Sequence, residues 1–340
     1  MLKRLLILLS GTLVAMLMAS AGGCGCGFGC NNDDDDDPGP ALLSLGFSDE
    51  SLEELKQVVI EVDRITLRRT TGEEIQVETF TIEDLGLVEA DTFQLDLLQY
   101  RGLNQLLVID QLELEPGSYS SIAIGILGGD VNRSYVQGAD DILREITVPA
   151  DTLSLPGVVL ASGNQRYTVA FSLAQALQYR SPTDDYRLTD TGMRVVDNAV
   201  AASLSGRVNS SLFDGVTPCD EKSDPESGVR VYLFQGTGLS ASVLADVHTG
   251  GSSAAIPDGA VAPFAVAALA RDVLTGRWQY ALGFLPSGDY TLAFACDSAG
   301  DDPVDFDGIA IPLPEDQQYD IRLDQGEQAV CDLAEGATCS

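Results

Sequence analysis

Residues 58–68 read Val-Val-Ile-Glu-Val-Asp-Arg-Ile-Thr-Leu-Arg, and this stretch decides the fold class. From Val58 to Val62 an apolar side chain occupies every second position, which is typical of a β-strand with one buried face. Ile65 and Leu67 continue the alternation in the opposite phase. One extra residue near Asp63 would produce that change, so the sequence predicts a β-bulge there.

Similar short apolar stretches recur on both sides of this strand. Turn residues separate them, for example Glu-Pro-Gly-Ser at 115–118 and Ala-Ser-Gly-Asn at 161–164. Many short strands with regular turns are typical of a β-sandwich or a barrel. The strands expected in this first series lie at 75–79, 93–98, 106–112, 119–127, 143–148, 158–160 and 167–173.

Two short helical segments are expected within the first series. Ser-Leu-Glu-Glu at 51–54 has the spacing of a capping box, which predicts one or two helical turns within 49–56. A further helical turn is expected at 174–179, before Pro182.

A second series of strands begins after residues 193–198 close the first. Its strands are expected at 202–208, 229–233, 265–270, 278–285, 290–295 and 319–323. Each series contains a turn with Pro and Gly followed by a tyrosine, Tyr119 or Tyr290, a pattern common in β-sandwiches. The sequence therefore predicts an all-β protein with two antiparallel β-sandwich domains, at 42–198 and 199–340.

The first domain resembles the DUF4382 family of bacterial exported proteins. The resemblance rests on the strand at 58–68, the Phe-Gln-Leu-Asp-Leu-Leu stretch at 93–98 and the turn at 114–119. The segments at 167–173 and 193–197 complete it. The turn departs from the family pattern by one residue. Because the family is one of unknown function, the resemblance implies an exported location and a fold but no chemistry.

The second domain is similar to transthyretin-like or carboxypeptidase-regulatory-like β-sandwiches. The matching stretches are 205–208, 228–233, 275–280 and 285–292. A long insertion at 236–261, rich in Gly, Ser and Ala, departs from the compact form of these modules. The resemblance implies a spacer or an adhesive surface.

The seven cysteines fall into two groups. Three lie in a Gly-rich segment near the N-terminus, and four, Cys219, Cys296, Cys331 and Cys339, lie in the second domain. An even number of cysteines in an exported domain predicts disulfides, and no Cys-x-x-Cys spacing indicates zinc. The preferred pairs are Cys219–Cys296 and Cys331–Cys339, and the alternative ties the tail back through Cys219 or Cys296.

Residues 1–23 have the pattern of a lipoprotein signal peptide. Lys3 and Arg4 precede an apolar run at 5–18, which is shorter than the about 20 residues that span a bilayer. Small residues then lead to Cys24, so Ala-Gly-Gly-Cys resembles a lipobox with Cys24 as the lipidated residue. The sequence predicts cleavage before Cys24 and a lipid anchor in the membrane.

The segment at 24–41 is predicted to be a flexible acidic tether. Its glycines favour flexibility, and the run Asp33–Asp37 is expected to repel itself and act as a solvated spacer. Cys26 and Cys30 are competing lipidation sites, and an ordinary secretory signal is the alternative. No Asp follows Cys24 closely, which favours the outer membrane, on its periplasmic or surface face.

The charge balance restricts the partners. The chain has 340 residues, 52 acidic and 19 basic side chains, and a formal net charge of −33. Such a surface repels nucleic acid, so no nucleic-acid partner is expected. Hydrophobic residues make up 45% of the chain, which indicates folded domains.

One acidic cluster could hold a cation. Asp301, Asp302, Asp305 and Asp307 lie close together before Gly308, in a sequence similar to part of a calcium loop. A Ca²⁺ site is therefore considered at these residues, and no other cofactor is expected. The alternative is an acidic hairpin tip.

Other residues suit a sugar ligand or its hydrolysis. Trp278 and Tyr280 alternate along one strand and could form a sugar-binding platform. Two pairs of neighbouring carboxylates, Asp140–Asp141 and Asp184–Asp185, could serve a glycosidase. His248 is the only histidine, and no Gly-x-Ser-x-Gly elbow accompanies it, so it is expected to be an ordinary surface residue.

Together these patterns predict a non-enzymatic cell-envelope lipoprotein that acts in binding, adhesion or structure. Its partners would be the membrane, through the lipid anchor, and an envelope protein or glycan. The alternatives are a carbohydrate-active hydrolase that uses paired carboxylates and a calcium-dependent adhesin.

Overall fold

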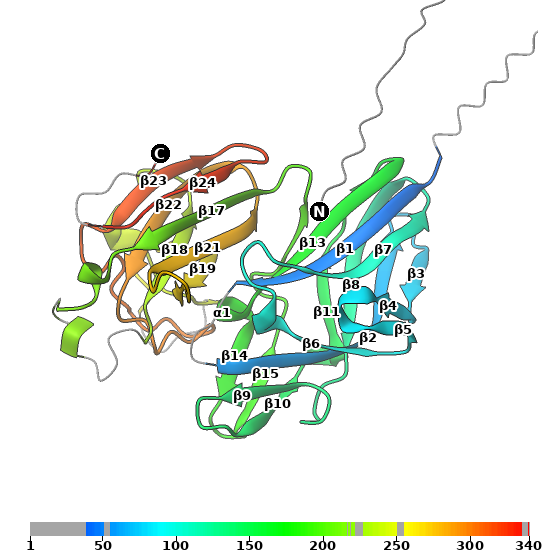
Figure 1. Ribbon diagram of the computed structural model, residues 1–340, viewed down its shortest axis with the longest axis horizontal. Coiled ribbons are helices and arrows are strands. Elements are labelled where there is room, and N and C mark those ends of the chain that lie inside the picture. Colours follow the sequence, from blue (N-terminus) through cyan, green and yellow to red (C-terminus); the bar gives the residue numbers. More distant parts are fainter. Residues whose placement is uncertain are drawn as a thin grey trace, which may run out of the picture. The chain divides into compact units, whose positions relative to one another are not determined.

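A computed structural model describes residues 39–50, 55–215, 217, 219–221, 227–249, 255–334 and 339. From Pro38 to Ser340 the chain forms one compact unit, drawn in Figure 1. The predicted signal peptide, Cys24 and the run Asp33–Asp37 lie outside the described residues.

The all-β prediction is confirmed, because nearly all regular structure is strand. The first half contains β1 (Ala41–Glu50), β2 (Leu55–Arg69), β3 (Glu74–Val77), β4 (Phe80–Ile82), β5 (Leu87–Ala90), β6 (Phe93–Asp96), β7 (Leu106–Leu114), β8 (Gly117–Ile126), β9 (Tyr135–Gly138), β10 (Leu143–Thr147), β11 (Thr152–Pro156), β12 (Val159–Leu160), β13 (Gly163–Ser172), β14 (Leu177–Arg180), β15 (Asp185–Leu188) and β16 (Arg194–Asp197). The second half contains β17 (Ala202–Val208), β18 (Arg230–Gln235), β19 (Ala265–Ala268), β20 (Ala270–Arg271), β21 (Trp278–Leu285), β22 (Gly288–Ala295), β23 (Gln318–Leu323) and β24 (Gln328–Val330). Helical segments are α1 (Leu173–Ala176) and the 3-10 turns η1 (Glu83–Leu85), η2 (Leu97–Gln99), η3 (Pro149–Asp151), η4 (Ser210–Leu212), η5 (Cys219–Glu221) and η6 (Ala241–Val243).

Two sheets enclose the core of the first half. One has the order β16-β13-β1-β7, and the other runs β11-β8-β2-β9-β10-β15-β14, with β3, β6 and β12 paired alongside and β4-β5 as a separate ribbon. Phe47 of β1 packs against Phe171 and Phe93, with ring centroids 5.4 and 6.5 Å away. The strand predicted at 58–68 belongs to β2, an inner strand of the larger sheet.

The second half has its own pair of four-stranded sheets. Their orders are β20-β21-β17-β24 and β19-β18-β22-β23. Val231 and Leu233 of β18 enter the core between these sheets, whereas Tyr232 and Phe234 point to the other face and join the core of the first half. Because both faces of β18 are buried, its sequence is a continuous apolar run.

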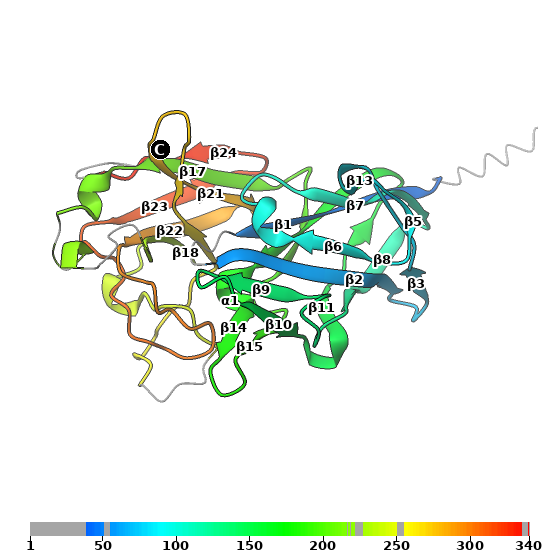
Figure 2. The ribbon, with the colours of Figure 1, turned by 60° about the horizontal axis from the view of Figure 1, so that its bottom comes forward.

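Both halves therefore share packing surface. Strands β17–β24 lie at one end of the unit and β1–β8 at the other, as Figures 1 and 2 show. Gln175 after β13 donates its side-chain amide to the carbonyl of Pro263 at 2.6 Å. Arg194 stacks its guanidinium over the ring of Phe264 at 4.8 Å. The contacts join the two halves without a flexible linker between them.

The predicted bulge in β2 is confirmed. Val62 pairs with Ile126 of β8, but Arg64 pairs with Gly125, so Asp63 is the extra residue. The predicted helical turns within 49–56 are wrong at every described position, because β1 continues to Glu50 and β2 begins at Leu55. Residues 51–54 lie outside the described residues. Pairing with β13 through Glu50, and the hydrogen bond from the Asp49 nitrogen to the carbonyl of Tyr100 at 2.7 Å, hold the end of β1 extended.

The helical turn at 174–179 is confirmed in part, since α1 ends at Ala176 and β14 begins at Leu177. The sheets also differ from a purely antiparallel prediction. The β1–β13, β10–β15 and β17–β24 pairs are parallel. Parallel neighbours need a long connection, and in each case distant stretches of chain are brought side by side.

The two turn tyrosines have the same role. The Tyr119 hydroxyl donates to the carbonyl of Glu115 at 2.9 Å, and the Tyr290 hydroxyl donates to that of Pro286 at 2.8 Å. In each case the acceptor lies four residues upstream, so the ring closes the turn that precedes β8 or β22. The shared sequence pattern thus corresponds to a shared tyrosine-corner geometry.

Candidate functional site

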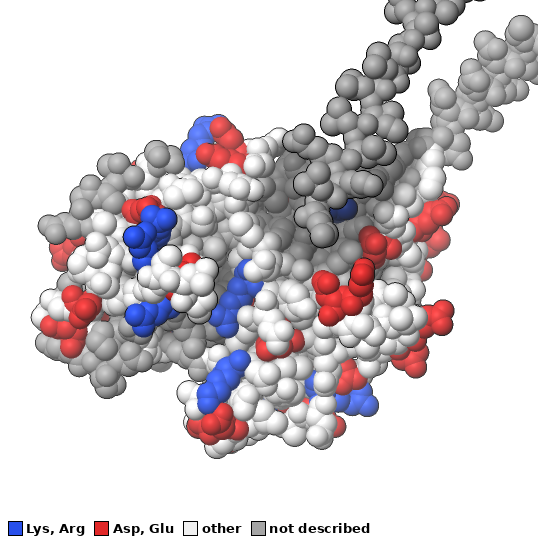
Figure 3. Space-filling view, in the orientation of Figure 1, with Lys and Arg blue, Asp and Glu red and all other residues white. Residues whose placement is uncertain are grey.

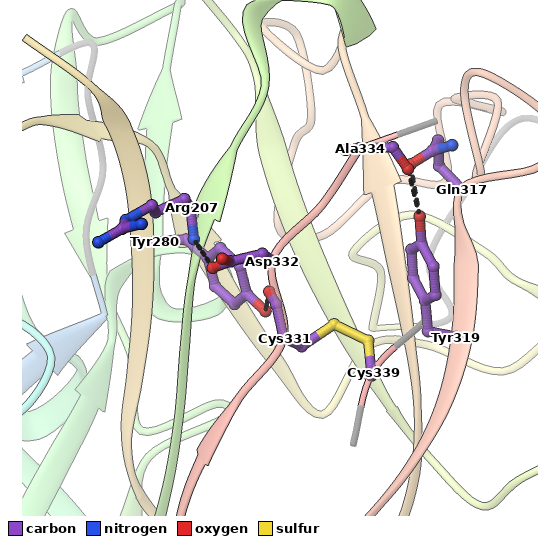
Figure 4. Close-up of a disulfide and its surroundings, with 8 residues drawn as sticks. All are labelled: Arg207, Tyr280, Gln317, Tyr319, Cys331, Asp332, Ala334 and Cys339. Atoms are coloured by element: carbon purple, nitrogen blue, oxygen red, sulfur yellow. Dashed lines mark hydrogen bonds between the residues drawn. A yellow bond between two sulfur atoms is a disulfide. The ribbon is translucent and has the colours of Figure 1, made fainter. Parts of the chain in front are cut away.

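Both preferred disulfides are confirmed. Cys219 is bonded to Cys296, with Cα atoms 5.8 Å apart, and Cys331 is bonded to Cys339, with Cα atoms 4.6 Å apart. The first bond joins η5 to the end of β22. The second closes the chain that follows β24, as Figure 4 shows. In the part of the chain that is described, no helix is long and apolar enough to cross a bilayer.

The proposed aromatic platform is divided between core and surface. The Tyr280 side chain is buried, its hydroxyl donates to the carbonyl of Cys331 at 2.8 Å, and burial raises its pKa. Tyr280 therefore supports the fold and is not available as a platform. Trp278 is half-buried, lies edge-on to Phe213 and carries the guanidinium of Arg271 over its ring at 5.6 Å.

The four candidate calcium ligands point to different places. Asp301 has a fully buried side chain that pairs with Arg230, whereas Asp302 accepts hydrogen bonds from the backbone nitrogens at 304 and 305. Asp307 accepts from the backbone nitrogen of Asp302 at 2.7 Å, and Asp305 is exposed. Within the described ranges, no three His, Cys, Asp or Glu side chains converge as a metal site would require.

One carboxylate from each predicted pair, Asp140 and Asp184, lies beside the same arginine, Arg144. Arg144 donates to Asp140 at 2.8 Å and to Asp184 at 2.6 Å. These hydrogen bonds lower the pKa of Asp184 and hold that of Asp140 at about 2. Both groups are ionised at neutral pH, whereas a glycosidase needs one carboxyl whose pKa is raised. Asp185 is bound instead by Arg180 and Thr183.

His248 lies in the insertion, with its ring edge-on to Phe306 at 5.9 Å between centroids. Both ring nitrogens are buried and have no hydrogen-bond partner among the described residues. Close by, Leu244 to Val247 are buried, and Val247 joins the core of the first half. The described part of the insertion thus belongs to the packed unit, and His248 is half-buried there, not the surface residue that the sequence predicts.

Sequence reasoning missed a long groove on the second half. Two adjoining hollows of about 610 and 580 Å³ meet at Arg207 and Asp332. The first lies over the outer face of the β20-β21-β17-β24 sheet and is walled by residues 101–104 of the first half. The second continues to the end of that sheet beside Trp278. We call these two hollows the arginine groove.

Four arginines line the arginine groove, namely Arg101, Arg207, Arg271 and Arg277. None of them forms an ion pair within the described residues; Arg166 and Arg187 also lack one there, whereas eight arginines, Arg144 among them, are matched to carboxylates. The Nε atom of Arg101 is buried without a hydrogen-bond partner. Figure 3 shows basic side chains over the part of this face where β17 and β21 lie, while acidic side chains dominate the opposite part.

The hairpin between β20 and β21 holds two of these arginines at its base. Asp272 accepts hydrogen bonds from the backbone nitrogens of Leu274 and Thr275 at 3.0 and 2.7 Å, and these bonds lower its pKa. Arg271 donates from Nε to the carbonyl of Gly276 at 3.2 Å. Because Asp272 accepts the hydrogen bonds of the turn's backbone nitrogens, the arginines are not needed for the turn. The terminal N–H groups of Arg271 and Arg277 therefore face solvent or a ligand.

The other two arginines come from opposite walls. Arg207 lies on the exposed face of β17. Its backbone nitrogen donates a hydrogen bond to the Asp332 carboxylate at 2.8 Å, whereas its side chain points away from Asp332 (Figure 4). Arg101 follows η2 in a loop that presses on β21. That approach needs glycine at two positions: Gly102 has φ +62°, and a Cβ on Gly283 would lie 2.0 Å from the Gly102 carbonyl oxygen.

The first half matches a known family. Residues 40–189 match the family model described as "Domain of unknown function (DUF4382)", which confirms the resemblance over that range. The similarity of the second domain to transthyretin-like modules stays a prediction. No curated protein matches the chain in sequence.

Solved structures give only distant likenesses. The chain is similar to a leucine-rich repeat protein from Bacteroides thetaiotaomicron, with 13% identity over 89% of this chain and 27% of that one, at a TM-score of 0.19. It is also similar to a protein from Bacteroides fragilis that is assigned to cell adhesion, with 9% identity over 88% and 94% of the two chains, at a TM-score of 0.20. A third is the minor pilin of Streptococcus agalactiae, with 12% identity over 87% and 96%, at a TM-score of 0.18. TM-scores this low carry no argument about fold or function.

Proposed function

We propose that this protein is a non-enzymatic, lipid-anchored binding module of the bacterial cell envelope, and that the arginine groove is its ligand surface. The observation that carries the proposal is that four arginines line one groove of a chain whose net charge is −33, and none of them is ion-paired within the described residues. They outnumber the two carboxylates of the lining, Asp214 and Asp332, so the groove is locally basic on an acidic protein. Exposed, forked guanidinium groups are suited to binding anionic groups on a partner.

A binding role also agrees with the chemistry of the candidate site residues. Asp140 and Asp184 are held ionised by Arg144, so neither can act as the acid of a hydrolase. The buried Asp301 has both oxygens engaged, by Arg230, Tyr232 and the Val247 nitrogen. The disulfides are typical of proteins that work outside the cytoplasm.

A sedimentation experiment tests the function. The full chain, purified in detergent, is mixed with insoluble cell-envelope fragments that have been stripped of lipid, so the anchor cannot hold it there. We expect the unaltered chain to sediment with the fragments. The triple variant R207Q/R271Q/R277Q should have an affinity for the fragments at least about tenfold lower, because each lost guanidinium removes charged hydrogen bonds.

The matched control is R166Q/R187Q/R322Q, which removes the same charge from exposed arginines elsewhere. It should bind like the unaltered chain. Equal binding by the triple variant, or no sedimentation of the unaltered chain, would show that the groove is not the ligand surface.

The lipid anchor makes a separate prediction. Replacing Cys24 with Ser removes the thiol that would accept the diacylglycerol, and anchoring depends on the acyl chains at about 0.8 kcal/mol per buried CH₂. Membrane fractionation should then find the protein in the soluble exported fraction. C26S is the control and should remain with the membranes. If C24S stays with the membranes and C26S leaves them, Cys26 is the lipidated residue.

A further inference from the structure

We infer that the arginine groove binds a linear polysaccharide that carries carboxylate groups. The inference rests on the proposed function and names its ligand class. The two hollows share Arg207 and Asp332 in their linings, so a ligand that occupies both must extend past these residues, as a chain of several sugars can and a small molecule cannot. Arginines occur along its whole length, from Arg101 in the wall of the first hollow to Arg277 in the second.

The polar groups between the arginines suit hydroxyl groups. Asn104, Ser205 and Gln279 line the first hollow, and each can both donate and accept a hydrogen bond. Asp332 lies where the hollows meet, and its carboxylate accepts from sugar hydroxyls but repels acidic groups. A site for a pure polyanion gains nothing from this carboxylate, whereas a site for an acidic sugar chain uses both kinds of group.

The groove reaches the edge strands β20 and β24, but its centre is unsuited to a peptide that binds by strand addition. Extended peptides bind a sheet by adding a strand along its edge, where backbone N–H and C=O groups are free. The first hollow crosses the outer face of the sheet instead, over Ser205 and Arg207 of β17 and Gln279 of β21. Backbone groups there are already paired between β17 and β21, so side chains must supply the recognition.

The chain contains a built-in reporter for this site. Trp278 is its only tryptophan and lies half-buried in the second hollow, with Arg271 over the ring. A ligand that engages Arg271 or Arg277 must change the surroundings of the indole. Intrinsic fluorescence therefore reports occupancy of the second hollow, and the arginine variants connect the signal to the groove.

The experiment is a fluorescence titration of the full chain in detergent with polygalacturonate. Three other polymers are compared with it: dextran, which is neutral, poly-L-glutamate, which is an acidic peptide, and dextran sulfate. We expect saturable binding of polygalacturonate that weakens as salt is added, no response to dextran, and at least tenfold weaker binding of poly-L-glutamate. Because the chain as a whole repels polyanions, binding requires a local basic site.

Variants connect the signal to the groove. R207Q is expected to weaken polygalacturonate binding about tenfold, whereas R187Q, which removes the same charge from an exposed arginine elsewhere, should not weaken it. Circular dichroism of R207Q should match the unaltered chain, because its guanidinium supports no described contact that the fold needs. Equal loss in R187Q would mean that net charge alone governs binding and would overturn the inference.

The polymers separate the ligand classes. Dextran sulfate binding more tightly than polygalacturonate would assign the groove to sulfate and overturn the carboxylate assignment. Poly-L-glutamate binding equally well would show an acidic peptide site, and the chain's own Asp33–Asp37 run would then be the first candidate, tested by replacing it with Ser. No response to polygalacturonate, combined with loss of envelope binding in the triple variant, would overturn the glycan inference but leave the proposed function standing.

Discussion

Replacing Asp301 with Ala is expected to lower the free energy of unfolding by about 3–5 kcal/mol at neutral pH. Arg230 lies 3.3 Å from the Asp301 carboxylate, and the two side chains are 6% and 0% exposed. The variant leaves Arg230 buried without that carboxylate, and guanidinium groups do not lose their charge in proteins. Tyr232, whose hydroxyl donates to Asp301 at 2.8 Å, and the Val247 nitrogen lose an acceptor as well.

The same residue predicts a pH dependence. Burial raises the pKa of Asp301 to about 7, although Arg230 and Tyr232 act in the opposite direction. A carboxyl whose pKa is higher in the folded than in the unfolded state binds more protons when folded. Its contribution to stability therefore falls as the pH rises from about 4 through about 7. Asp140, whose folded pKa is lowered to about 2, is ionised in both the folded and the unfolded state above about pH 5.5 and adds no slope there.

Urea unfolding at pH 5.5 and pH 8.0 measures both effects. The unaltered chain should be more stable at pH 5.5, and D301A should lose most of that difference. D305A is the control, because Asp305 is exposed and lies in the same loop, and it should unfold like the unaltered chain. A loss below about 1 kcal/mol in D301A, or an unchanged pH slope, would show that the buried pair does not hold the insertion against β18.

Removing the Cys219–Cys296 disulfide is the second large effect. Its cysteines are 77 residues apart, against 8 for Cys331–Cys339. In the chain-entropy account, a closed loop of that size restricts the unfolded state by about 4.5 kcal/mol, and the short loop by about 2.5 kcal/mol. C219A/C296A should therefore lose about 2 kcal/mol more stability than C331A/C339A.

Guanidinium unfolding without reductant compares the two double variants directly. Cys219 and Cys296 are both buried, whereas in the second pair Cys331 is buried and Cys339 only half-buried, so packing and loop length both favour a larger loss in C219A/C296A. Equal losses in the two variants would contradict the chain-entropy account. A larger loss in C331A/C339A would show that the Tyr280 contact with Cys331 depends on the short loop.

Much of the local structure could be predicted from the sequence because it depends on neighbouring residues. The alternation in β2 and its phase change at Asp63 located both a strand and its bulge. The turns before Tyr119 and Tyr290 were recognisable because the tyrosine binds a carbonyl four residues away. The helix expected within 49–56 fails at 49, 50, 55 and 56 for the opposite reason: strand pairing, with β13 at Asp49 and Glu50 and with β9 at Leu55, outweighed a local helix preference.

The disulfide pairing was predictable because one pair is separated by only eight residues, which leaves the other two cysteines for each other. The calcium and sugar-platform predictions depended on side-chain direction, which the sequence does not contain. Asp301 turned inward to Arg230, and Tyr280 turned inward to Cys331. In both cases the sequence placed the residue correctly along the chain, but packing in the folded protein decided whether its side chain points inward or to solvent.

The sequence by itself determined the strand content, the two series of strands, the tyrosine turns and the cysteine pairing, since each depends on periodicity or on short separations. Only the tertiary structure decided the second buried face of β18 and the parallel pairing of β1 with β13. It alone also created the arginine groove, because Arg101, Arg207 and Arg271 are far apart in the chain and become neighbours only when the loop at Gly102 packs on β21. Charges that are isolated in sequence acquire a shared field only when folding brings them to one surface.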